Sequence, residues 1–362
     1  MPLSNVKPEQ YTKLLQQKVA DKLALFDKFE LPSIEVFSSA PIAYRMRAEF
    51  RLWHQGEDLY YAMFKPDQPK TPCRIDSFPI GCISIQKLMP ALLEGLQVNP
   101  LLRKRLFQVE FLSSQTEQTL VTLIYHRQLT DDWFDEAKKL ATDLNVQLIG
   151  RSRKQKLIID NDYIDESLTI GTKQYHYRQY EQAFTQPNAG VNEKMIGWAK
   201  ALNEGPSTDL IELYCGNGNF TIPLAENFKK ILATEISKTS VKAAEFNLKR
   251  NGINNIDIVR MSAEDASKAI QGEREFRRLR NIAIDAFNFS TIFVDPPRAG
   301  LDELSERLVS QFDNIIYISC NPLSLNKNLE QICKTHRIEK FAFFDQFPYT
   351  DHMESGVYLK RG

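Results

Sequence analysis

The spacing of apolar residues changes character along the chain and predicts a helix followed by a strand-rich region. Residues 9–29 contain no Gly or Pro and carry apolar residues at helical intervals, which predicts an amphipathic helix across residues 8–30. Apolar and polar residues then alternate over residues 44–53. A similar run at 59–64 follows the polar turn at 55–58. This pattern predicts an antiparallel hairpin.

The rest of the first half combines helices with further strands. Helices are predicted at two places and strands at four, namely helices at 86–98 and 131–143 and strands at 107–112, 120–125, 146–152 and 156–160. We therefore expect an α+β region whose sheet has one open face.

The second half has the regular alternation of strands and helices that builds a parallel sheet. Beyond the loop at 184–190, apolar strands are predicted at five places, each followed by a helical segment: 210–214, 230–234, 256–261, 291–295 and 314–319. Such βα repetition predicts a doubly wound sheet. Two final strands, 341–344 and 356–359, have no helix between them and should pair antiparallel. That ending is typical of Rossmann-like methyltransferase sheets and unusual for dinucleotide dehydrogenases.

Length and composition fit two domains of a globular protein. The chain has 362 residues, of which 43% are hydrophobic and 25% charged. We expect an α+β domain, N-terminal helix included, over residues 1–180 and an α/β domain over residues 181–362. No apolar run is long enough to span a membrane, and the first residues lack an apolar signal core. A cytoplasmic, monomeric protein without membrane contact is expected.

Cysteines and bulk charge exclude some functions. The five cysteines form no CxxC pair, so neither a disulfide framework nor a zinc site is predicted. Net charge is zero, but three basic clusters lie in the first half. They are Arg45, Arg47 and Arg51; Arg103, Lys104 and Arg105; and Arg151, Arg153, Lys154 and Lys156. Together they favour one shared phosphate-facing surface.

A glycine turn after the first strand of the second half is a candidate cofactor site. Gly216 and Gly218 allow close backbone approach to a ligand at a helix start. The third glycine of a dinucleotide fingerprint would fall at position 221, which is Thr. Glu235 ends the next strand, where a carboxylate can accept both ribose hydroxyls. This combination favours S-adenosylmethionine over a nicotinamide cofactor.

Two further strand ends carry candidate chemistry. Cys320 follows an apolar strand and precedes Asn321-Pro322, while Asp295 stands before two prolines that fix a rigid exit from its strand. Ligands of open α/β sheets bind at the carboxyl ends of the strands. A cysteine delivered there is a candidate nucleophile.

Taken together, these motifs resemble those of the RNA uracil C5-methyltransferases. The shared segments are Phe184–Asn188, Leu213–Phe220, Asp295–Arg298, Ser319–Pro322 and His352–Glu354. The resemblance implies that Cys320 is the nucleophile and that Glu354, in the loop between the last two strands, is the base that removes the C5 proton. It also assigns contact with S-adenosylmethionine to a set of residues: Gln186, Tyr214, Asn219, Glu235 and Asp295, with Gly216 and Gly218 in the turn.

The first half is similar to the tRNA-specific members of that family. Ribosomal-RNA members often hold an iron–sulfur cluster through four cysteines, but residues 1–180 contain only Cys73 and Cys82. We therefore expect no metal or cluster. The resemblance implies methylation of uridine 54 in the tRNA T-arm, with other RNAs carrying a T-arm-like hairpin as further partners. The candidate RNA contacts are Arg51, Phe107, His126 and Arg127. A ribosomal-RNA uracil methyltransferase and a non-catalytic tRNA-binding or tRNA-folding protein are the alternatives.

Overall fold

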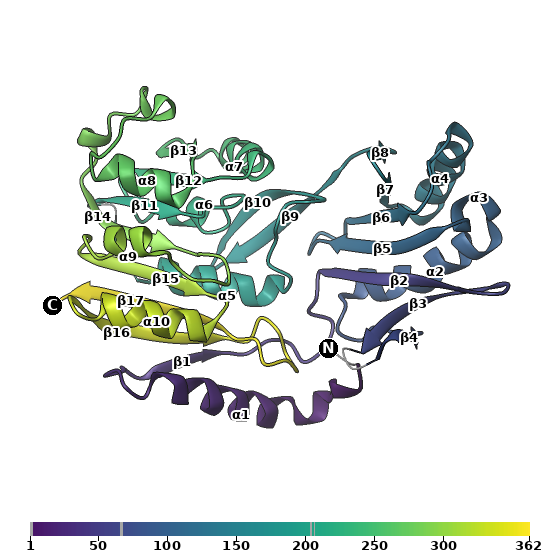
Figure 1. Cartoon of the computed structure of the whole chain (residues 1–362), viewed down its shortest axis with the longest axis horizontal. Helices are drawn as coiled ribbons and strands as arrows, with labels where there is room; N and C mark the ends of the chain where they lie inside the picture. Colours follow the sequence, from purple (N-terminus) through teal and green to yellow (C-terminus); the bar gives the residue numbers. More distant parts are fainter. Residues whose placement is uncertain (1–2, 66–67, 203–204, 206) are drawn as a thin grey trace. The chain divides into compact units, whose positions relative to one another are not determined.

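The computed structural model describes residues 3–65, 68–202, 205 and 207–362. The chain forms two compact units, each built from discontinuous segments (Figure 1). The first unit contains the residues up to Pro8, Ala40–Ser167 and Arg178–Ala189. The second contains Glu9–Ser39, Leu168–Tyr177 and Gly190–Gly362.

The first unit is built on a seven-stranded sheet with strand order β4-β3-β2-β5-β6-β7-β8. Its strands are β2 (Arg47–Gln55), β3 (Asp58–Lys65), β4 (Gln68–Ile75), β5 (Leu106–Ser113), β6 (Thr119–Tyr125), β7 (Gln147–Ser152) and β8 (Gln155–Ile158). Neighbouring strands are antiparallel except β6 and β7, which α4 (Asp131–Leu144) connects in parallel. The hairpin expected around residues 55–58 is β2–β3.

One face of this sheet carries the core of the first unit. Alternation along β2 buries Phe50 and Leu52 on the side where α2 (Ile83–Val98), α3 (Pro100–Arg103) and α4 pack. At Gly150 on β7, an added Cβ would lie 2.2 Å from the indole of Trp133 in α4. Glycine is therefore required at position 150 for the helix to lie this close to the sheet.

The opposite face is partly covered by residues that follow the hairpin β9 (Tyr163–Ile170) and β10 (Lys173–Tyr180), which the sequence did not indicate. The Arg47 guanidinium donates hydrogen bonds to the carbonyls of Ala183 (3.0 Å) and Glu181 (2.9 Å). The Glu181 carboxylate in turn pairs with Arg151 on β7. Basic residues expected on an RNA-facing surface thus serve partly to hold this segment in place.

The second unit contains an eight-stranded sheet with strand order β1-β16-β17-β15-β14-β11-β12-β13. The strands are β1 (Ile34–Phe37), β11 (Asp209–Leu213), β12 (Ile231–Glu235), β13 (Ile256–Arg260), β14 (Phe289–Val294), β15 (Asn314–Ser319), β16 (His336–Phe344) and β17 (Glu354–Arg361). The helices are α1 (Tyr11–Leu23), α5 (Ala189–Lys200), α6 (Thr221–Leu224), α7 (Lys238–Arg250), α8 (Ala263–Ile270), α9 (Glu303–Val309) and α10 (Pro322–Ile332).

Strand β17 lies between β15 and β16 and is antiparallel to both, which confirms the expected terminal hairpin. Helices α1, α8, α9 and α10 cover one face of the sheet around a continuous apolar core. On the other face, the ring of Trp198 in α5 packs edge-on against Phe344 with centroids 5.8 Å apart. The second unit therefore has helices on both faces of a mostly parallel sheet, as its sequence predicts.

The division of the chain differs from the expected boundary at residue 180. Helix α1 and strand β1 belong to the second unit, because β1 pairs in parallel with β16 and extends its sheet. The Tyr11 hydroxyl donates to Asp345 (2.8 Å), and the Lys18 ammonium pairs with the same carboxylate at 2.7 Å. These contacts join residues more than 300 positions apart, so local sequence patterns could not indicate them.

Candidate active site and nucleic-acid surface

The predicted catalytic groups gather at one edge of the second sheet. Strands β11, β12, β14 and β15 are parallel neighbours, so the residues that follow or end them lie along the same edge. Asp295 follows β14, and Cys320 follows β15. Because β17 is antiparallel to β15 with Ser355 opposite Ser319, Glu354 at its start lies at that edge as well. Glu354 is thus the first residue of a strand, rather than part of a loop as expected.

The glycine turn after β11 has the backbone that its sequence predicts. Tyr214, Gly216 and Gly218 have φ values of +63°, +58° and +86°. An added Cβ at Gly218 would lie 3.0 Å from Ile222, so the helix that follows packs close to the turn. At Gly216 no atom lies within 4 Å of such a Cβ, so open space borders the turn there. Glycine is needed at position 216 for its backbone conformation and at position 218 also for space.

Glu235 is oriented by the turn that it faces. One carboxylate oxygen accepts a hydrogen bond from the Gly216 N–H (3.0 Å), and the other accepts one from Ser237 N–H (2.7 Å). Each carboxylate oxygen has a further lone pair, so both can still accept from ribose hydroxyls. The amide of Asn219 is paired with that of Asn192 through two hydrogen bonds of 2.8 and 2.9 Å.

A buried carboxyl beneath the glycine turn supports a ligand site there. Glu212 on β11 is 1% exposed, and one of its carboxyl oxygens has no hydrogen-bond partner among the described residues. Burial raises the pKa of Glu212 to about 8. An unpartnered buried carboxyl of this kind, two residues before a glycine turn bordered by open space, fits the expected adenosine ligand with its polar groups.

The loops that carry Asp295 and Cys320 are tied together by Asn321, which belongs to the sequence motif, and by Asn328, which sequence reasoning missed. The Asn321 amide donates to the carbonyl of Arg298 at 3.0 Å and its oxygen caps α10. Asn328 is buried, and its oxygen accepts from the Tyr317 hydroxyl (2.7 Å) and the Leu301 N–H (3.0 Å). Their side chains fix the two loops relative to each other.

Three ionisable groups at this edge have raised pKa values. Burial raises the pKa of Asp295 to about 7. Burial raises the pKa of Glu354 to about 8. The charge of Asp295 adds to this effect, and the Lys18 ammonium opposes it. Burial and the charges of Glu354 and Asp295 raise the pKa of the Cys320 thiol to about 11. A thiol and two carboxyls whose pKa values lie near neutrality are therefore found at one partly buried edge, as is common at functional sites.

The predicted cofactor residue Gln186 belongs to the first unit. It lies after β10 in a segment whose Asn188 forms a β-bridge with Arg45. Its expected contact with S-adenosylmethionine stays a prediction.

Three of the four candidate RNA contacts form a stack in the first unit. The Arg51 guanidinium lies 3.7 Å from the centroid of the Phe107 ring. The ring of His126 is stacked with Phe107 at a centroid distance of 4.0 Å and an interplanar angle of 28°. They come from β2, β5 and the residue after β6. Nothing in local sequence predicts this stack, since strand pairing creates it.

A cavity of about 440 Å³ opens beside the stack. It is lined by Arg51, Leu52, Trp53, His54, Phe64, Arg105, Leu106, Phe107 and His126. No role could be assigned to Trp53 or His54 from the sequence. Alternation along β2 places the Trp53 side chain on the same face of the strand as that of Arg51. Cationic and aromatic side chains around a cavity are suited to holding an unstacked base.

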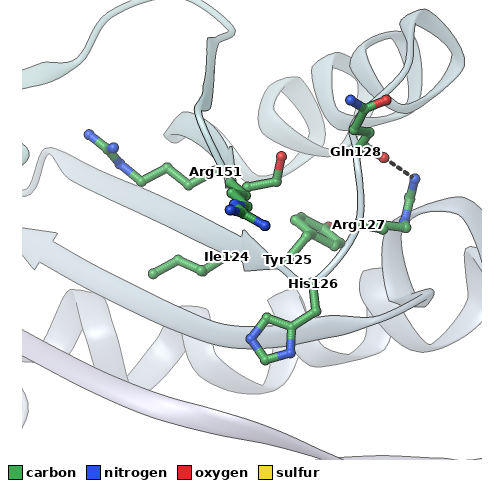
Figure 2. A pocket seen from close by; sticks show the side chains of 8 residues that line it. Ile124, Tyr125, His126, Arg127, Gln128 and Arg151 are labelled. Carbon is green, nitrogen blue, oxygen red and sulfur yellow. Dashed lines mark hydrogen bonds between the residues drawn. The ribbon is translucent and has the colours of Figure 1, made fainter.

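Arg127, the fourth candidate, is held by the backbone around it. Its guanidinium donates hydrogen bonds to the carbonyls of Lys104 (2.8 Å), Leu101 and Gln128 (3.0 Å), and Figure 2 shows the bond to Gln128. Because carbonyls are neutral, these bonds orient the guanidinium without cancelling its charge.

Helices on both faces of the sheet, the antiparallel last strand and the glycine turn facing Glu235 define the methyltransferase class of α/β proteins. A solved structure with the same fold is the Pyrococcus abyssi tRNA (uracil-54, C5)-methyltransferase in complex with S-adenosyl-L-homocysteine. The TM-score is 0.73 at 19% identity, covering 96% of this chain and 83% of that one.

The sequence comparisons give the family itself. The family model for tRNA (Uracil-5-)-methyltransferase matches residues 10–362. A tRNA/tmRNA (uracil-C(5))-methyltransferase of Saccharophagus degradans is 54% identical over 360 residues, covering 99% of both chains. One of Colwellia psychrerythraea is 52% identical over 362 residues, again covering 99% of both. The chain belongs to the tRNA (uracil-5-)-methyltransferase family, whose members are S-adenosylmethionine-dependent enzymes.

Two further features are absent from the described residues. No helix among them is long and apolar enough to cross a membrane. Within the same residues, no group of three or more His, Cys, Asp or Glu side chains is arranged to hold a metal ion.

Proposed function

We propose that this chain methylates C5 of uridine 54 in the tRNA T-loop, through a covalent adduct with Cys320 and proton removal by Glu354. The observation that carries the mechanism is the β15–β17 register, which brings Glu354 to the strand edge where Cys320 and Asp295 lie. Support for the substrate comes from the family, from relatives named for tRNA and tmRNA, and from the solved structure named for uracil-54.

Cys320 has to activate a poor nucleophile. C5 of uracil gains carbanion character only after a nucleophile adds to C6, and a thiolate at Cys320 can make that bond. S-adenosylmethionine, when bound, supplies the methyl group that C5 takes up. The raised pKa of Cys320 keeps it a thiol in the free protein, so the thiol must pass its proton to a base as it attacks. The Asp295 carboxyl at the same edge has a pKa of about 7, and its ionised form can accept that proton.

Glu354 completes the cycle. After C5 is methylated it still carries its hydrogen, and the ionised carboxylate removes this as a proton. The electron pair of the C–H bond restores the C5–C6 double bond, and the C6–S bond breaks to return the Cys320 thiolate. A pKa of about 8 makes this carboxylate a stronger base than an exposed glutamate.

The remaining predicted residues would bind the two substrates. S-adenosylmethionine would bind at the strand edge, where its contacts would be Tyr214, Gly216, Gly218, Asn219, Glu235 and Asp295. Gln186 would be a further contact. The Arg51–Phe107–His126 stack would receive a base of the RNA, because aromatic and guanidinium planes stack on unpaired bases. Arg127 would add positive charge beside it. RNAs with a T-arm-like hairpin, including tmRNA, are the expected substrate range.

The test uses the full-length protein with labelled S-adenosylmethionine. Transcripts of tRNA, tmRNA, an isolated T-arm hairpin and ribosomal RNA fragments are incubated separately, and the modified nucleotide is mapped. The label should appear on the T-loop uridine of tRNA and of the hairpin. A transcript with cytidine at that position and the Cys320→Ala variant are the matched controls. Methylation of ribosomal fragments with none on the hairpin would refute the proposed substrate.

A further inference from the structure

A second cavity of about 570 Å³ adjoins the aromatic one in the first unit. It is lined by residues from the end of β6 and from β7 with the turn that follows it: Ile124, Tyr125, His126, Arg127, Gln128, Arg151, Ser152 and Arg153 (Figure 2). His126 lines both cavities. A ligand that occupies the aromatic cavity and contacts His126 therefore has a basic cavity next to it.

The lining of this second cavity carries positive charge and no carboxylate. The bonds from Arg127 go to neutral carbonyls, so its charge is not cancelled. Arg153 is exposed and makes no hydrogen bond or ion pair with any described residue. Two guanidinium charges are thus available at this cavity.

Arg151 gives the cavity a fixed wall. Its guanidinium binds both oxygens of the buried Glu181 carboxylate, with one distance of 2.6 Å. Burial alone would raise the pKa of Glu181, but the Arg151 guanidinium and Lys156 ammonium outweigh it and hold that pKa below its ordinary value. The ion pair is therefore kept at neutral pH, and Arg151 cannot turn away to leave the cavity.

We propose that this cavity binds a backbone phosphate of the RNA, adjacent to the nucleotide whose base stacks in the Arg51–Phe107–His126 cavity. The proposal rests on the proposed function, because it takes an RNA as the substrate. A stacking platform beside a cationic cavity matches the two halves of one nucleotide, a flat base and a charged phosphodiester. Phosphate contacts fix register, so the cavity would set which base reaches the platform.

Arg153 is the residue that tests the site, because no described residue depends on its side chain. Arg153→Ala should weaken binding of tRNA about three- to tenfold at physiological salt. The slope of log Kd against log salt should fall in magnitude by about 0.7–0.9, the value for one phosphate contact. Arg153→Lys should restore the slope, since it keeps the charge. The matched control is Lys138→Ala on α4, which packs on the opposite face of the sheet, and it should change neither quantity.

A chemical change in the RNA locates the phosphate. T-arm hairpins are prepared with one backbone phosphate at a time replaced by a neutral methylphosphonate, and each is titrated against wild-type protein and Arg153→Ala. One position should weaken binding to wild type, and that same replacement should have no added effect in Arg153→Ala. Equal salt slopes for wild type and Arg153→Ala, or additive losses at every position, would overturn the phosphate site.

The two proposals fail in different ways. If wild-type protein methylates the T-loop uridine while Arg153→Ala keeps its salt slope, only the phosphate site is wrong. If wild type methylates no tRNA, the proposed function itself is wrong, whatever the binding data show.

Discussion

Removal of the C5 proton by Glu354 should have a steep and measurable pH dependence. The carboxyl is 4% exposed, and its pKa is raised to about 8. Only the ionised form can accept a proton, so the rate of elimination should follow the ionised fraction. With this pKa the fraction is about 1% at pH 6, about 10% at pH 7 and about 90% at pH 9. The rate constant should therefore rise about tenfold from pH 6 to pH 7 and less than twofold from pH 8 to pH 9.

The assay follows each step in a single turnover. RNA labelled with tritium at C5 of the target uridine is mixed with excess protein and S-adenosylmethionine, and tritium released into water reports proton removal. The adduct is measured on denaturing gels. Release is expressed per adduct present, because the raised pKa of Cys320 makes adduct formation depend on pH as well. A methylated adduct should accumulate at pH 6 and disappear at pH 9.

The matched variant is Glu354→Gln, which keeps the shape of the side chain but cannot take a proton. It should form the methylated adduct and hold it at every pH. A release rate per adduct that is flat from pH 6 to pH 9 would refute the reasoning, since a glutamate with its ordinary pKa is ionised throughout this range. Normal turnover by Glu354→Gln would instead make His352 or Asp351 the base to test.

Three further substitutions test the second unit. Glu235→Ala should weaken S-adenosylmethionine binding by about 1.5–3 kcal/mol in titration calorimetry, because it removes charged acceptors, and equal affinity would place the ribose elsewhere. Glu212 has a folded-state pKa of about 8, above its ordinary value. The stability that this buried acid contributes is therefore complete below about pH 4.5 and is lost as pH rises through 8. In Glu212→Gln, the free energy of unfolding measured with urea should depend less on pH between those limits. A pH dependence equal to that of the wild type would contradict the raised pKa of Glu212. Lys18→Met leaves the buried Asp345 carboxylate without its ionic partner and with the Tyr11 hydroxyl as a remaining side-chain donor, so stability should fall by about 3 kcal/mol. A loss near zero would show that the pair is solvated.

The sequence alone indicated most of the elements and the candidate residues at their ends. Apolar runs such as 314–319 indicated buried strands, and turn residues after them placed Cys320, Asp295 and Glu235 where parallel strands end. These conclusions depend on residues close in sequence. Local spacing is enough to set the period of an element and to mark its end.

Only the tertiary structure decided which of these ends meet and what surrounds them. Insertion of β17 between β15 and β16 brings Glu354 to the edge that carries Cys320. The helix predicted over residues 8–30 joins the second unit through the pairing of β1 with β16 and through contacts with Asp345, both far along the chain. The Arg51–Phe107–His126 stack likewise arises from the pairing of β2, β5 and β6. Strand order and long-range ion pairs join distant residues, and no local period in the sequence encodes them.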